Sequence, residues 1–131
     1  MTSLRSVLVL LLLAASPAMA QNIASGAALY ADHCAVCHGT GLLGDGPMAE
    51  VLVIPPPNLR RIEAESGFFP RVGVAGLIDG RDPLAAHGGD MPIFGRIFGD
   101  FNEVMTSPGG QTVLTSQQVV DLVDFLETQQ D

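Results

Sequence analysis

Residues 34–38 read Cys34-Ala35-Val36-Cys37-His38. The two thiols are three positions apart, so on a helical turn they lie on the same side of the chain. The histidine that follows adds an imidazole, which is a good ligand for transition metals when it is neutral. Both cysteines of the chain lie in this run, so no disulfide framework can stabilise the fold. The run therefore predicts a site that holds a reactive or metal-containing group.

Three chemistries use a cysteine run of this kind. A Cys-x-x-Cys-His sequence is the attachment motif of c-type haem, in which each thiol forms a thioether and the histidine becomes an axial iron ligand. A structural zinc site needs four ligands, and His33 and His38 are poorly placed to complete one with the cysteines. A dithiol redox motif needs a βαβ context, which the sequence lacks. We therefore expect one covalent haem c on Cys34 and Cys37, with His38 as the proximal ligand.

The first twenty residues have the pattern of an export signal. Arg5 precedes nine apolar residues from Val7 to Ala15, and Ala18-Met19-Ala20 has the small-x-small form of a cleavage site. Nine apolar residues are too few to span a bilayer, which needs about twenty. The sequence thus predicts a signal peptide at residues 1–20, a single domain at residues 21–131, a periplasmic location and no stable membrane insertion.

Charge excludes one class of partner. After residue 20 the chain has five Arg, no Lys and fourteen Asp and Glu, a net charge of −9. Nucleic acid binding needs clustered positive charge, so we expect none. The same region has one Tyr, six Phe and no Trp, a small supply of large core side chains. A buried haem would supply much of the missing apolar surface.

Apolar periodicity predicts helices at both ends of the mature chain. Residues 23–34 form the first, in which Gly26 and Tyr30 would let another helix approach closely beside an aromatic ring. Thr115 and Gln118 have the spacing of a capping box for the last helix. Its apolar positions repeat at helical spacing at Val119, Leu122, Val123 and Leu126.

The sequence between them is rich in Gly and Pro. Short helices are expected at residues 47–53, at residues 71–79 with Gly80 as the stop, and at residues 93–98. Residues 107–110, Ser-Pro-Gly-Gly, predict a turn. Without strand alternation, these elements indicate a small all-α domain.

Taken in order, these blocks resemble the class I monohaem c-type cytochromes, in particular small bacterial periplasmic ones, over nearly the whole mature sequence. Beyond the haem motif, the similar stretches are Gly44-Asp45-Gly46-Pro47, Pro55-Pro56-Pro57-Asn58-Leu59 and Met91-Pro92-Ile93-Phe94-Gly95. The resemblance implies an all-α class I cytochrome c fold, with the N- and C-terminal helices packed together around one covalent haem, and a monomer.

The resemblance also suggests roles for Pro47 and Met91. The Pro47 carbonyl would accept the Nδ1–H of His38, a role compatible with simply starting a helix. Met91 would be the distal iron ligand, because it lies in a compact Gly-rich loop stiffened by Pro92. His87 and an open sixth site are the alternatives, while His33 would point elsewhere. Of the other mature methionines, Met48 would pack in the core and Met105 lies in a polar stretch.

Further residues are candidates for the pocket. Apolar candidates, for which ordinary core packing is an equal alternative, are Leu52, Leu59, Ile78, Phe94 and Phe98. Arginines that could pair with a haem propionate, or lie on the solvated surface, are Arg60, Arg61, Arg71 and Arg81.

The sequence therefore predicts a periplasmic electron-transfer protein that is not an enzyme, with one haem c and His/Met axial ligation. Its redox partners would have a basic or an apolar docking face. Two alternatives stay open. The chain could be the cytochrome subunit of a periplasmic dehydrogenase or oxidase complex, or a haem enzyme or sensor with an open sixth site.

Overall fold

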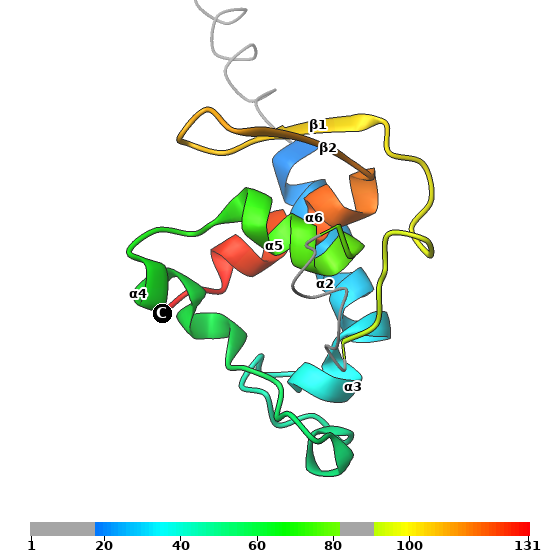
Figure 1. Ribbon diagram of the computed structural model, residues 1–131, viewed down its shortest axis with the longest axis vertical. Coiled ribbons are helices and arrows are strands. Elements are labelled where there is room, and N and C mark those ends of the chain that lie inside the picture. The colour runs from blue at the N-terminus through cyan, green and yellow to red at the C-terminus, as the bar shows by residue number, and fades with distance from the viewer. Residues whose placement is uncertain (1–17, 82–90) are drawn as a thin grey trace, which may run out of the picture.

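Helices and one small hairpin build the described part of the chain. The computed structural model describes residues 18–81 and 91–131 (Figure 1). In chain order the elements are α2 (Ala18–His33), α3 (Ala35–His38), the 3₁₀ turns η1 (Ala49–Val51) and η2 (Leu59–Arg61), α4 (Ile62–Ser66), α5 (Arg71–Asp79), β1 (Glu103–Thr106), β2 (Thr112–Thr115) and α6 (Gln117–Thr128). No helix in these residues is both long enough and apolar enough to span a membrane.

The first and last helices cross at Gly26, as predicted. A Cβ atom at Gly26 would lie 2.0 Å from the main-chain oxygen of Asp121 and 2.7 Å from the Cβ of Phe125. The ring of Tyr30, one turn later in α2, lies 5.5 Å from the ring of Phe125. The missing side chain thus lets the two backbones meet, and the aromatic pair packs beside the crossing.

Replacing Gly26 by alanine should destabilise the protein by about 3 kcal/mol or more, at the upper end of overpacking costs, because the obstacle is main chain. Gly73 is the matched control, since it is an exposed helical glycine whose added Cβ would meet nothing closer than 3.8 Å. Gly73→Ala should stabilise by roughly 0.5–1 kcal/mol. Urea unfolding measures both, and a Gly26→Ala protein as stable as wild type would contradict the close crossing.

The N-cap of α6 lies one residue later than expected. The hydroxyl of Ser116 accepts a hydrogen bond from the Val119 N–H, 3.4 Å away, so Ser116 is the N-cap. Thr115 instead ends β2, is fully buried, and donates its hydroxyl to a carboxylate oxygen of Asp79, 3.2 Å away. The predicted capping box at Thr115 and Gln118 is therefore wrong, because Ser116 is the cap and Val119, three residues later, has no polar side chain to complete a box.

Of the three short helices expected in the middle of the chain, only the one at residues 71–79 has its predicted bounds. Helix α5 spans residues 71–79 as expected, and Gly80 ends it with a φ of 79°, in the left-handed region that glycine adopts freely. The helix expected at residues 47–53 is only the 3₁₀ turn η1. Residues 93–98 form a single turn, in which the Ile97 and Phe98 N–H groups donate to the Phe94 carbonyl.

A β-hairpin, which was not expected, precedes α6. Strands β1 and β2 pair antiparallel, with Glu103 opposite Thr115 and Thr106 opposite Thr112. The turn predicted at residues 107–110 is the hairpin loop, closed by the Ser107 N–H donating to the Gln111 carbonyl. Strands this short carry too few residues to show a clear alternation. The hairpin lies over one end of the helices (Figure 1), and the helical core agrees with the predicted all-α class.

Candidate functional site

The cysteine run, residues 34–38, is the attachment turn: Cys34 follows α2, and the other four residues form the single turn of α3. The N–H groups of Cys37 and His38 both donate to the Cys34 carbonyl, at 3.1 and 2.9 Å. The buried hydroxyl of Tyr30 donates to the Gly39 carbonyl at 2.7 Å, which holds the end of the run against α2. The backbone therefore presents both thiols and the imidazole from one fixed turn.

Both cysteines are free and half-buried. Burial, together with the nearby Cys37, raises the pKa of the Cys34 thiol to about 11. Reactive dithiol motifs work through a lowered thiol pKa, so the raised pKa disfavours that alternative. In the described residues no group of three or more His, Cys, Asp and Glu side chains could hold a metal ion, which removes the support for a structural zinc site.

An apolar cavity of about 370 Å³ opens beside this turn. Its size is within the range of small-molecule and cofactor sites. Its lining residues are Tyr30, His33, Cys34, Val36, Cys37, His38, Leu52, Ile54, Pro55, Pro56, Pro57, Leu59, Ile62, Val74, Leu77, Ile78, Gly80, Met91, Pro92, Ile93, Phe94, Leu122 and Leu126. None of them is Asp, Glu, Lys or Arg, so the cavity suits a large apolar group.

His38 is buried at the cavity wall, with 8% of its surface exposed. Burial lowers the pKa of His38, so the neutral imidazole that an iron ligand requires is favoured. Within the described residues its Nδ1 atom has no hydrogen bond of normal geometry. The main-chain carbonyl of Pro57 acts as a weak acceptor for the ring. It raises the pKa of His38 and so partly offsets the effect of burial. A buried imidazole of this kind fits metal ligation through its other nitrogen.

Pro57, rather than Pro47, is the proline that the structure brings to His38. Pro57 lines the cavity and influences the pKa of the imidazole. Pro47 is exposed, between Gly46 and Met48, whose N–H groups donate to the carbonyls of the attachment turn. No described contact joins Pro47 to the ring, so its role stays a prediction. Three consecutive prolines at residues 55–57 gave no signal that one of them would lie here.

Met91 is the described methionine that lines the cavity, together with Pro92, Ile93 and Phe94. Its side chain is 40% exposed. Met105, on β1, is buried in the core. Met48 was expected in the core but is 43% exposed, so that prediction is wrong. His87 lies outside the described residues. The structure thus brings Met91 and His38 to one cavity, while ligation of iron by either remains a prediction.

The aromatic residues of the pocket include His33, whose position was predicted wrongly. His33 was expected to point away, yet it lines the cavity, and its ring lies 5.3 Å from Phe98 and 6.0 Å from Phe94. Of the apolar candidates, Leu52, Leu59, Ile78 and Phe94 line the cavity. Phe98 packs behind it, stacked on Phe94 with the ring centres 5.5 Å apart.

None of the arginines proposed as propionate partners lines the cavity. Three of them pair with carboxylates instead: Arg60 with Asp131, Arg71 with Asp124 and Glu127, and Arg81 with Asp79. The pairs of Arg60 and Arg71 join segments far apart in the chain, whereas Arg81 and Asp79 lie two residues apart.

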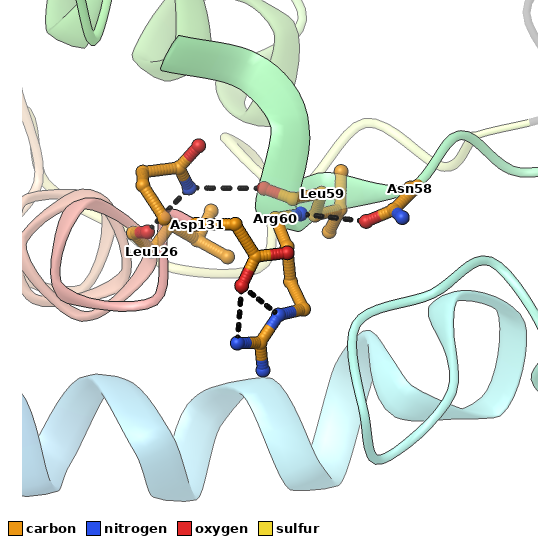
Figure 2. A network of polar contacts seen from close by, with 6 residues as sticks. Asn58, Leu59, Arg60, Leu126 and Asp131 are labelled. Carbon is orange, nitrogen blue, oxygen red and sulfur yellow. Dashed lines mark hydrogen bonds and ion pairs between the residues drawn. The ribbon is translucent and has the colours of Figure 1, made fainter. Parts of the chain in front are cut away.

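Residues 130 and 131 join two walls of the cavity (Figure 2). The Asp131 N–H donates to the Arg60 carbonyl at 3.0 Å, and the Arg60 guanidinium donates back to the Asp131 carboxylate. The Gln130 amide donates to the carbonyls of Leu59 and Leu126 at 2.9 and 2.7 Å. Leu59 and Leu126 both line the cavity, so these bonds join two of its walls, from residues 58–62 and from α6.

Comparison with known proteins gives one match. The family model described as cytochrome c matches residues 23–130. No curated protein and no solved structure matches the chain significantly. The matched region contains the attachment turn, every cavity-lining residue and both terminal helices.

Proposed function

Because this chain belongs to the cytochrome c family, we propose that it is a periplasmic carrier of single electrons with His38 and Met91 as axial ligands. The family binds covalently attached haem c and takes part in haem-based electron transfer. The observation that supports the finer proposal is the convergence of Cys34, Cys37, His38 and Met91 on one apolar cavity.

Each residue has a defined task in this proposal. Cys34 and Cys37 would hold the haem through two thioethers, and His38 and Met91 would bind its iron. When bound, the haem supplies the one-electron couple between ferrous and ferric iron. The apolar lining excludes water, and the attachment turn fixes His38, so the ligands need little rearrangement when the charge changes. Because Met91 fills the position where a substrate would bind, we assign no enzymatic activity.

The surface around the attachment turn suggests the kind of redox partner. Residues 31–59 contain no Arg or Lys, and their acidic residues are Asp32, Asp45 and Glu50. Large apolar side chains that do not line the cavity are exposed on the same segment, namely Leu43, Met48, Val51 and Val53. Residues 43–53, which carry these side chains, lie beside α3 (Figure 1). We therefore propose a partner whose docking face is basic or apolar.

Small oxidants test both electron transfer and charge. The ferrous protein should lose one electron per molecule to a tripositive cobalt phenanthroline complex and to ferricyanide. Because the mature chain carries a net charge of −9, the rate with the cationic oxidant should fall as salt rises, and the rate with ferricyanide should rise. Salt screens such attraction over about 8 Å at physiological ionic strength. Stopped-flow absorbance measures both rates, and the opposite salt trends would contradict the acidic-surface proposal.

A second candidate is a cytochrome subunit in a fixed periplasmic dehydrogenase or oxidase complex. The exposed apolar side chains of residues 43–53 favour it, because permanent interfaces are more apolar than transient ones. Affinity purification from the native periplasm separates the two candidates: a shuttle should isolate alone, and a subunit should bring its catalytic partner in fixed stoichiometry.

A further inference from the structure

The end of α5 packs directly against the stretch that carries Met91. The Phe94 N–H donates to the Ile78 carbonyl at 2.9 Å. A side chain at Gly80 would collide with Ile93, whose Cγ2 atom would lie 2.3 Å from the added Cβ. Met91 is two residues before Ile93, so the position of Met91 depends on how firmly the end of α5 is held.

Asp79, the last residue of α5, holds that end through a fully buried carboxylate. Arg81 donates to it from its main-chain N–H at 3.1 Å and from its guanidinium, with the closest contact at 2.6 Å. Thr115 on β2 donates its hydroxyl to the same carboxylate. A buried carboxylate of this kind is costly to leave unpaired, so its contacts with Arg81 and Thr115 hold the end of α5 in place.

Asp79 and Arg81 also contact two residues that follow Met91 in the chain. Gly95 packs so closely on Asp79 that an added Cβ would lie 2.4 Å from the Asp79 carbonyl oxygen. The Arg81 guanidinium lies over the ring of Phe101, 5.3 Å from its centre. The carboxylate of Asp79 thus joins α5 to β2 through Thr115. Through Arg81 it also joins α5 to the segment that contains Phe101.

We propose that Asp79 is a positioning residue that fixes Met91 in its axial place. The inference rests on the proposed function, since it takes Met91 as the distal ligand. Asp79 is not among the residues that line the cavity, so it acts on Met91 indirectly. It acts by pairing with Arg81 and Thr115, which keeps the end of α5 in place against Ile93 and Phe94. Without the carboxylate, Met91 loses its fixed support while the attachment turn around His38 is unaffected.

The test uses the haem-loaded protein and imidazole, which binds ferric iron only as the methionine sulfur leaves it. Asp79→Asn should raise the affinity for imidazole at least roughly tenfold, the size expected when members of one contact network are uncoupled. It should also weaken the near-infrared band of methionine-ligated ferric haem. Arg81→Gln, on a side chain that is 37% exposed, should shift both readouts in the same direction by a smaller factor.

Asp124→Asn is the matched control. Asp124 pairs with Arg71 at the opposite end of α5, far along the helix from Gly80, so its loss should lower the melting temperature and leave imidazole affinity unchanged. If Asp79→Asn behaves like Asp124→Asn, the positioning role is overturned. If Asp79→Asn does not fold, an unchanged imidazole affinity in Arg81→Gln overturns it. If instead Met91 is not the distal ligand, the wild-type protein itself should lack the near-infrared band, so the two failures can be distinguished.

Discussion

Replacing Met91 by alanine should abolish the near-infrared band of the ferric protein while the haem stays covalently attached. The band arises from sulfur–iron ligation, and Met91 is the described methionine that lines the cavity with His38. The reduction potential should fall by on the order of 0.1 V, because a soft sulfur donor that favours ferrous iron is replaced by water. Optical spectra and a potentiometric titration measure the two effects.

Two other methionines and one histidine provide the controls for Met91. Met105→Leu keeps the volume of a buried core side chain, Met48→Ala changes an exposed one, and both should preserve the band. His87→Ala should preserve it as well. A Met91→Ala protein that keeps the band, while one of these variants loses it, would show that the distal ligand is misassigned. Carbon monoxide binding to wild-type ferrous protein at neutral pH would instead indicate an open sixth site.

The predictions that the structure confirmed rest on patterns among residues close together in the sequence. The attachment run is contiguous, so its helical turn follows from neighbours along the chain. Gly80 ends α5 because only a residue without Cβ readily adopts its φ of 79°. The Gly26 and Tyr30 spacing indicated a close helix crossing, and the family resemblance implied the C-terminal helix as the partner. The point of contact, the backbone at Asp121, came only from the structure.

The contacts that the sequence did not predict join residues far apart in the chain. Thr115 and Ser116 are adjacent hydroxyl residues, and only the end of β2 decides which of them caps α6. The partner of Thr115 is Asp79, which is 36 positions away, so no local pattern predicts that pair. Pro57 reaches His38 because the segment after η1 folds back along the cavity, which the proline spacing alone does not specify.

Replacing both Cys34 and Cys37 by alanine should leave a colourless chain without a cooperative unfolding transition. Without thioethers, the apolar cavity of about 370 Å³ loses the group that fills it. At about 24 cal/mol per Å³, an empty cavity of that size costs on the order of 9 kcal/mol. That cost is comparable to the whole stability of a small domain, about 5–15 kcal/mol. The chain has no Trp and one Tyr to compensate.

The single variants Cys34→Ala and Cys37→Ala separate attachment from packing. Each keeps one thioether, so each should retain colour after denaturation in acid acetone, as the wild-type protein should, and each should fold. Calorimetry and near-ultraviolet circular dichroism follow the folding of all four proteins. A colourless double variant that melts cooperatively near the wild-type temperature would contradict the role of the cofactor as core. Complete extraction of colour from the wild-type protein would contradict attachment at these two cysteines, because a thioether survives conditions that break the bond between His38 and iron.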